Sequence, residues 1–129
     1  MVTDRVGDFI IRLKNAGAIG KQLVAVPYSK HVEAIAKKLQ ALGYVEHVAK
    51  GKNPYEFEVT LKFDERGNSR IRGVKRTSKP GRRLYTPATS AHSVKNGMGA
   101  RIISTPKGVL TDSEARKVRV GGEDLFEIW

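Results

Sequence analysis

The pentapeptide Ser104-Thr105-Pro106-Lys107-Gly108 carries residue types that are suited to contacting a polar polymer. It places two hydroxyls, a cation and a flexible glycine side by side. Hydroxyls and lysines of this kind hold phosphate, sugar and base edges in nucleic-acid interfaces. The pentapeptide directly follows the apolar pair Ile102-Ile103. We therefore expect a turn at the end of a buried strand, with chemistry suited to RNA recognition.

This turn lies in a segment of a single charge sign, residues 66–111. Its 46 residues hold eleven Lys or Arg and no Asp or Glu. Globular surfaces normally mix both signs, so we expect a partner molecule to supply the negative charge. The chain carries a net charge of +11, of which residues 66–129 contribute +9 (14 basic, 5 acidic) and residues 1–65 contribute +2 (10 basic, 8 acidic). The alternative is a basic surface that serves only solubility.

Several classes of protein are disfavoured by the sequence. There is no cysteine, which excludes disulfides and thiolate metal sites. The three histidines, His31, His47 and His92, are far apart, so we expect no metal site. No P-loop or nucleophile elbow occurs, so we expect no cofactor and no catalytic residue. The charged N-terminus and the lack of a long apolar run predict a cytoplasmic protein without a membrane partner.

The elements that must position the turn fall into two lobes of an α+β fold. Residues 1–64 predict an α-β-α-β-β lobe from their apolar periodicity. Its elements are a helix over 3–16 ended by Gly17, a strand over 22–26, a helix over 30–42 capped by Ser29 and ended by Gly43, and strands over 44–50 and 55–63. Alternation in the last strand predicts one buried face, formed by Tyr55, Phe57, Val59, Leu61 and Phe63.

Residues 65–129 predict a second lobe that is mostly β with one short helix. The helix is expected over 112–118, because Thr111 and Glu114 have the spacing of a capping box. The expected strands cover residues 69–76, begin at 83–85, and cover 100–105 and 124–129. The fold class predicted from the sequence is therefore α+β.

Several sequence blocks occur in a fixed order along the chain. They are Asp4 to Asn15, Val26 to Lys30, Arg76 to Tyr85, Ser104 to Asp112, Ala115-Arg116 and Gly121-Gly122-Glu123. Through these blocks the chain resembles, nearly end to end, the bacterial family of the eighth small-subunit ribosomal protein. The resemblance implies two α/β lobes and a non-enzymatic protein of the ribosome. It implies direct binding to the central domain of 16S ribosomal RNA at an irregular stem, and a role in assembling the platform. An irregular stem fits, because regular A-form RNA hides its base edges.

The resemblance also implies site residues and partners. The residues for RNA binding are Ser104, Thr105, Lys107, Gly108, Tyr85 and Glu123 at the stem, the basic residues Arg76, Lys79, Arg82 and Arg83, and, in the first lobe, Thr3, Arg12, Asn15, Ser29 and Lys30. The implied protein partners are the fifth and twelfth small-subunit proteins. Binding to the chain's own operon messenger RNA is a further implication. One position departs from the family: its loop usually reads Ser-Thr-Ser, whereas Pro106 removes a hydroxyl and an amide donor here.

Plainer interpretations stay open at this point. Tyr85 could be a core aromatic, Thr111 and Glu114 could be a helix cap and nothing more, and Glu123 could only relieve like-charge repulsion. A different class of function is also open. In that case the Lys107 turn and the helix start at Thr111 would hold a phosphorylated small substrate of an enzyme.

Overall fold

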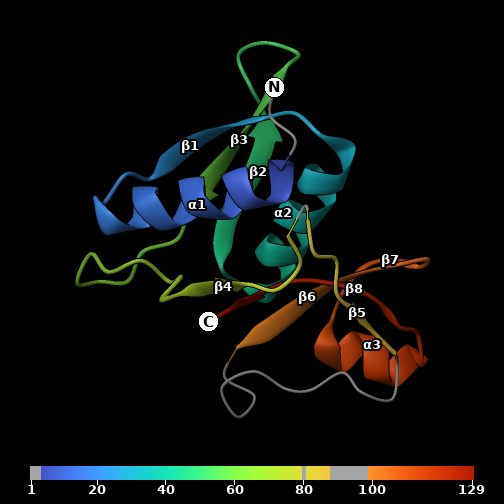
Figure 1. Cartoon of the computed structure of the whole chain (residues 1–129). Coiled ribbons are helices and arrows are strands. Elements are labelled where there is room, and N and C mark those ends of the chain that lie inside the picture. Colours follow the sequence, from blue (N-terminus) through green and yellow to red (C-terminus); the bar gives the residue numbers. More distant parts are fainter. Residues whose placement is uncertain (1–3, 80, 88–98) are drawn as a thin grey trace. The chain divides into compact units, whose positions relative to one another are not determined.

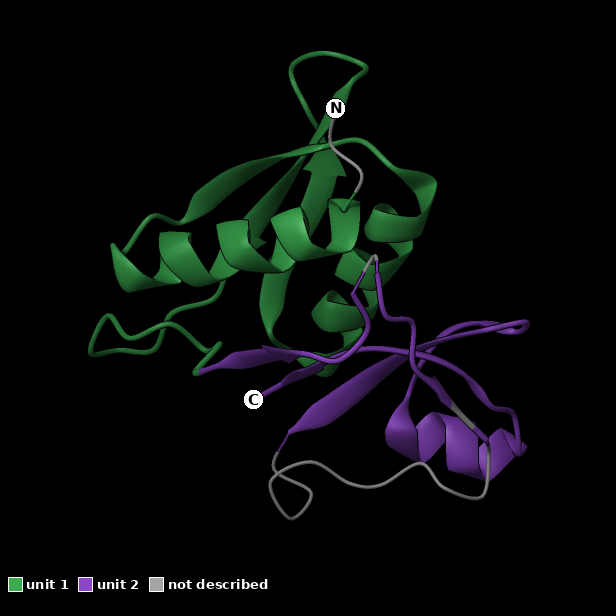
Figure 2. Cartoon of the chain, in the orientation of Figure 1, with its two compact units in different colours: residues 1–72 green, residues 73–129 purple. Residues whose placement is uncertain are grey.

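The structure, a computed structural model, describes residues 4–79, 81–87 and 99–129 (Figure 1). The chain divides into two compact units, residues 1–72 and residues 73–129 (Figure 2). Each unit has its own sheet, which confirms the α+β class. The sequence placed the boundary after Asp64, whereas residues 65–72 group with unit 1. The Arg70 amide donates to the Lys62 carbonyl at 2.8 Å, and Phe63 forms a bridge with Ser69.

Unit 1 is built from two helices and a three-stranded antiparallel sheet. Its elements are α1 (Arg5–Ala18), β1 (Leu23–Pro27), α2 (Lys30–Leu42), β2 (Val45–Lys50) and β3 (Glu56–Leu61). The strand order is β1-β3-β2, so β3 lies in the middle (Figure 1). The core is apolar, and its largest fully buried side chains are Phe9, Leu13, Val26, Val32, Ile35, Leu39, Phe57 and Leu61.

The helix ends follow the capping residues, with one correction. The predicted cap of α2 is confirmed: Ser29 Oγ accepts from the Val32 amide at 3.5 Å, and Gly43 ends the helix with a φ of 89°. The prediction that Gly17 ends α1 is wrong, because the helix continues to Ala18. A Cβ at Gly17 would lie 2.8 Å from Ser69 Oγ. The glycine therefore serves close packing there.

The predicted burial of strand 55–63 is partly confirmed. Phe57, Val59 and Leu61 are buried as expected. Phe63 is only half-buried, and Tyr55 is 80% exposed, so the expectation for Tyr55 is wrong. Tyr55 precedes β3, where its amide donates to Asn53 Oδ1 at 2.9 Å. Alternation does not extend into that turn.

The described residues of unit 2 form five strands and one short helix. Its elements are β4 (Val74–Arg76), β5 (Tyr85–Thr86), β6 (Ala100–Thr105), β7 (Gly108–Thr111), α3 (Asp112–Val118) and β8 (Gly122–Ile128). The order is β4-β8-β6-β7, and β5 also pairs with β8. Ala115 of α3 packs with Ile103 of β6, and both are fully buried. The capping box is confirmed: the Glu114 amide donates to Thr111 Oγ1 at 3.2 Å, and the Thr111 amide donates to Glu114 Oε1 at 3.1 Å.

Three expectations for unit 2 need correction. The strand expected over 69–76 is limited to its last three residues, β4. The last strand begins at Gly122, two residues earlier than expected. Strand β7 is not predicted from the sequence, because its four residues directly follow Pro106-Lys107, which indicate a loop. The sequence also predicts an irregular stretch over 86–99, because Pro87, Gly97 and Gly99 interrupt it. This stretch lies mostly outside the described residues, since 88–98 are not among them.

Candidate nucleic-acid interface

Three of the predicted site residues lie in one row across the sheet of unit 2. Glu123 of β8 pairs with Tyr85 of β5 on one side and with Ser104 of β6 on the other. Directly opposed residues of antiparallel strands project from the same face. Tyr85 is 71% exposed, so the interpretation of Tyr85 as a core aromatic is wrong. The sheet thus presents an aromatic ring, a carboxylate and a hydroxyl side by side.

Glu123 also holds a basic residue beside this row. Arg83 Nη1 lies 3.0 Å from Glu123 Oε2, and the two side chains are 47% and 19% exposed. The ion pair joins residues forty positions apart in the sequence. Glu123 therefore fixes the Arg83 guanidinium next to Tyr85, which is more than a general relief of like-charge repulsion.

The basic loop before β5 is held in place by hydrogen bonds of a buried serine, Ser78. Ser78 Oγ accepts from the Leu84 amide at 2.9 Å and donates to the Leu84 carbonyl at 3.2 Å. Between Ser78 and Leu84, Lys79 and Arg82 exchange two backbone hydrogen bonds of 2.9 Å. Both side chains are therefore presented on a tight, pinned turn. Sequence reasoning missed Ser78, although a small polar residue directly before a turn is a typical position for such hydrogen bonds.

The pentapeptide itself forms a β-hairpin turn between β6 and β7. Thr105 pairs with Gly108, and Pro106 and Lys107 occupy the two turn positions. Thr105 Oγ1 donates to the Gly108 carbonyl at 2.8 Å and accepts from the Lys107 amide at 3.1 Å. The Thr105 hydroxyl proton is therefore used inside the turn. Proline cannot adopt the positive φ that the usual two-residue hairpin turns, types I′ and II′, require at this position. It is instead favoured at the first central position of type I and type II turns.

Ser104 and Thr105 do not project together, although the sequence expectation placed both in one site. Successive residues of a strand point to opposite faces, which separates the Thr105 side chain from the row of Ser104. The backbone of Ser104 also lies close to Gly122, which has no side chain. A Cβ added at Gly122 would overlap the Ser104 carbonyl and lie 3.0 Å from Thr105 Cα. Glycine at position 122 therefore permits the close approach of β8 to β6 at this point.

The basic residues of segment 66–111 divide into paired and unpaired ones. Arg101 Nη1 lies 3.1 Å from Asp124 and its Nη2 lies 2.7 Å from Glu127, with only 16% of the side chain exposed. The expectation that only a partner supplies negative charge is thus wrong for Arg101 and Arg83. Among the described residues of the segment in unit 2, the exposed cations without an ion pair are Lys75, Lys79, Arg82 and Lys107. Arg76 is half-buried, and its Nε donates to the Ser78 carbonyl at 2.7 Å.

The residues predicted for unit 1 occupy α1 and the start of α2. Arg12 is an exposed residue of α1, where its Nε lies 2.9 Å from Asp8 Oδ2 and its Nη1 donates to the Ala25 carbonyl at 3.2 Å. Asn15 is exposed one turn further along the helix. Ser29 is the cap of α2 and Lys30 is its exposed first residue. Thr3 lies outside the described residues.

Other kinds of site find little support in the described part of the chain. There, no group of three His, Asp or Glu side chains is arranged to hold a metal ion. No described helix is long and apolar enough to cross a membrane. Among the described residues, the carboxyl of Asp64 has a shifted pKa: the Asn68 and Arg66 amides donate to Asp64 and lower the pKa of its carboxyl below the ordinary value of 3.8.

Comparison with known proteins identifies the family of the chain. The family model described as ribosomal protein S8 matches residues 4–129. The small ribosomal subunit protein uS8 of Nautilia profundicola is 42% identical over 131 residues, with both chains fully covered. That of Nitratidesulfovibrio vulgaris is 44% identical over 129 residues, again with full coverage of both chains. That of Bartonella henselae is 44% identical and covers 99% of this chain and 98% of its own. The chain therefore belongs to the ribosomal protein S8 family.

Proposed function

We propose that the chain binds the central domain of 16S ribosomal RNA directly, at an irregular stem, and so helps to assemble the platform of the small subunit. As a member of its family, it is a structural, non-enzymatic protein of the small ribosomal subunit. This membership also argues against the alternative of an enzyme with a phosphorylated substrate. The proposal concerns the RNA target and the residues that recognise it.

The observation that carries the proposal is the row of Tyr85, Glu123 and Ser104 on one face of the sheet. Unpaired bases of RNA stack on exposed aromatic rings and form hydrogen bonds through their edges. Tyr85 offers such a ring, and Ser104 offers a hydroxyl two strands away. Because both stand on paired strands, the spacing between ring and hydroxyl is fixed before RNA arrives. A rigid row of this kind fits splayed bases of an irregular stem better than a regular duplex.

The cations around the row would bind phosphates. Lys79 and Arg82 lie on the turn that Ser78 holds, and Lys107 lies on the hairpin turn whose shape Thr105 maintains. Arg83 is oriented by Glu123. Phosphate contacts supply affinity without sequence information, whereas the row supplies selectivity. In this proposal Thr105 acts by positioning Lys107 and Gly108.

The rest of the proposal concerns unit 1 and further partners. Arg12, Asn15, Ser29 and Lys30, and Thr3 outside the described residues, would add contacts to the RNA backbone. We also propose contacts to the fifth and twelfth small-subunit proteins and binding to a mimic of the rRNA site on the chain's own operon messenger RNA. These partners are inferred from the family likeness.

A titration with three ligands tests the function. The ligands are a transcript of the irregular stem from the central domain, a regular duplex of equal length, and a mononucleotide. We expect binding to be tightest to the stem, weaker to the duplex and negligible to the mononucleotide. Equal affinity for stem and duplex would contradict the proposal, and tight binding of the mononucleotide would favour the enzyme alternative.

A second experiment tests the role of the row. Ser104→Ala removes one hydroxyl from an already formed strand. We expect it to reduce the preference for the stem over the duplex by about 1–3 kcal/mol, the scale of one readout contact in nucleic-acid recognition. Thr105→Ser keeps the turn hydroxyl and serves as the matched control, with the preference retained. If Ser104→Ala weakens binding to both RNAs equally, the row does not supply selectivity.

A further inference from the structure

Unit 1 exposes two tyrosines that the proposed function does not use. Tyr28 is 44% exposed and Tyr55 is 80% exposed. They are cross-strand neighbours, because the Tyr28 amide donates to the Tyr55 carbonyl at 2.7 Å, just beyond the paired residues Pro27 and Glu56. Large exposed aromatic side chains are unusual away from binding surfaces when they occur together.

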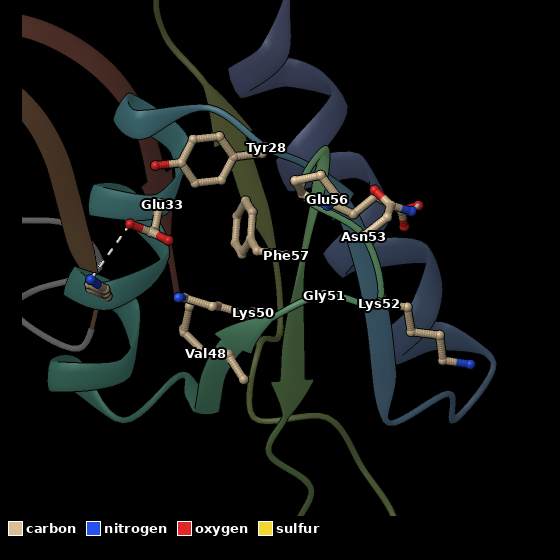
Figure 3. A pocket seen from close by; sticks show the side chains of 12 residues that line it. Tyr28, Glu33, Val48, Lys50, Gly51, Lys52, Asn53, Glu56 and Phe57 are labelled. Atoms are coloured by element: carbon tan, nitrogen blue, oxygen red, sulfur yellow. Dashed lines mark hydrogen bonds and ion pairs between the residues drawn. The ribbon is translucent and has the colours of Figure 1, made fainter.

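Tyr28 forms one wall of a groove of about 680 Å³ (Figure 3). Its ring stands edge-on to the buried Phe57, with the ring centroids 6.4 Å apart. Lys50 also lines the groove, and Figure 3 shows its amine and the Tyr28 hydroxyl both directed toward the α2 side. On that side, Lys37 Nζ lies 3.6 Å from Glu33 Oε1. A groove of this volume is large enough for one nucleotide.

Tyr55 lines a second hollow next to the first. This hollow is lined by Arg12, Ala25, Pro27, Tyr55 and Glu56, and Glu56 lines both hollows. Arg12 is held in place by Asp8 at 2.9 Å and by the Ala25 carbonyl at 3.2 Å. The first hollow thus combines the exposed Tyr28 with three lysines, Lys37, Lys50 and Lys52. The second combines the exposed Tyr55 with Arg12.

The loop that carries Tyr55 is held by its own hydrogen bonds. Asn53 accepts from the Tyr55 amide at 2.9 Å and donates to Glu56 Oε1 at 2.8 Å. The Gly51 amide donates to the Glu56 carbonyl at 3.2 Å. The exposed ring is therefore presented by a fixed loop, which lowers the entropy lost when a flat ligand stacks on it.

We propose that Tyr28 and Tyr55 form a stacking platform for two unpaired nucleotides of a single-stranded RNA segment, with Lys50 and Arg12 binding the adjoining phosphates. The inference rests on the proposed function, because it adds a single-stranded contact to a protein that binds rRNA. Proteins that bind single-stranded nucleic acid with little sequence preference combine aromatic rings, on which bases stack, with cations that bind the backbone. Both hollows offer this combination. Lys50 forms no ion pair among the described residues, so its charge is available for a phosphate.

The test compares two RNA probes: a ten-nucleotide oligouridine, which has no stem, and the stem transcript without single-stranded ends. The variants are Tyr28→Leu and Tyr55→Leu, alone and together. Stacking is worth about 1–3 kcal/mol per base, so each substitution should weaken oligouridine binding roughly 5- to 150-fold. Binding to the stem transcript should stay within about twofold of the wild type on the same scale.

Three controls make the result specific. Tyr28→Phe and Tyr55→Phe keep a ring and should retain oligouridine binding. Ile19→Ala removes a 77% exposed apolar side chain outside both hollows and should have no effect on either probe. Tyr85→Leu should show the opposite pattern, with loss of stem binding and retention of oligouridine binding.

The outcomes separate this inference from the proposed function. If the wild type prefers the stem but the leucine variants bind oligouridine unchanged, the platform is refuted and the proposed function stands. If the leucine variants instead lose binding to another small-subunit protein with RNA binding intact, the surface is a protein-docking site and the inference is wrong. A wild type without preference for the stem would overturn the proposed function.

Discussion

The two units hold their charged side chains in different ways. In unit 1, two ion pairs join residues one helical turn apart, Arg12 with Asp8 and Lys37 with Glu33, and both cations are exposed. A third pair, Arg72 with Asp64, is long at 4.0 Å and also exposed. Unit 2 also has one pair within a helix, Arg116 with Asp112, but it adds a buried pairing between strands. There Arg101 reaches Asp124 and Glu127, 23 and 26 positions away. Exposed local pairs contribute little to stability, whereas a buried pair is costly to break. The Arg101 pairs therefore hold the sheet of unit 2 together, whereas the cations of unit 2 without an ion pair are the ones that bind RNA in the proposed function.

The largest difference between the units should appear when a cation of a pair is removed. Arg101→Met keeps the aliphatic length but leaves Asp124 and Glu127 without their guanidinium, next to the core of unit 2. We expect a loss of roughly 3–5 kcal/mol in the free energy of unfolding, measured by urea denaturation. The matched change in unit 1, Lys37→Met, should cost only about 0.3–0.5 kcal/mol. Similar costs for both variants would remove the distinction between the units.

A smaller loss of stability is expected when a side chain is introduced at Gly122. Gly122→Ala places a Cβ against the Ser104 carbonyl and must push β8 away from β6. We expect a loss of about 1–3 kcal/mol in stability, the usual cost of overpacking. Gly81→Ala is the control, because a Cβ at position 81 meets no atom within 4 Å. If Gly122→Ala leaves the urea midpoint unchanged, the sheet tolerates the displacement and the close approach is not needed.

Substitution of the neighbouring Arg82 and Arg83 should change the salt dependence of RNA binding by different amounts. Arg82 is exposed and forms no ion pair among the described residues, so Arg82→Ala should reduce the slope of log K against log salt by about 0.7–0.9. Arg83 already pairs with Glu123, so Arg83→Ala should change the slope less. Filter binding at several salt concentrations measures both. Equal slopes for the two variants would mean that the Glu123 pair opens when RNA binds.

The smallest effect concerns the pH dependence of stability in unit 1. The Asn68 and Arg66 amides lower the pKa of the Asp64 carboxyl in the folded chain. The resulting stabilisation is fully present above the ordinary value of 3.8 and is lost as the pH falls through the lowered pKa. Asp64→Asn should therefore flatten the loss of stability below pH 3.8 and leave its slope unchanged at neutral pH, as measured by thermal unfolding at several pH values. A steeper loss in the variant would contradict this assignment.

Local signals in the sequence were sufficient for much of the fold. The helix over 30–42 and the capping box at Thr111 were predicted correctly, because caps and apolar periodicity act within a few residues. Strand β6 was also predicted with its observed bounds. Errors occurred where a residue's role depends on a distant neighbour, as for Gly17, which packs against Ser69. The error at Tyr55 has a local cause, because Tyr55 lies in a turn held by Asn53, where the alternation of β3 has not yet begun.

The sequence by itself determined the fold class, the charge asymmetry and the family, because composition, periodicity and ordered motifs can be read along the chain. Only the tertiary structure decided which basic residues are paired and which stay available, since the acidic partners of Arg83 and Arg101 lie on β8. It also decided that Ser104 shares a face with Tyr85 while Thr105 does not. Strand pairing sets both outcomes, because register brings distant residues together and alternation separates adjacent ones.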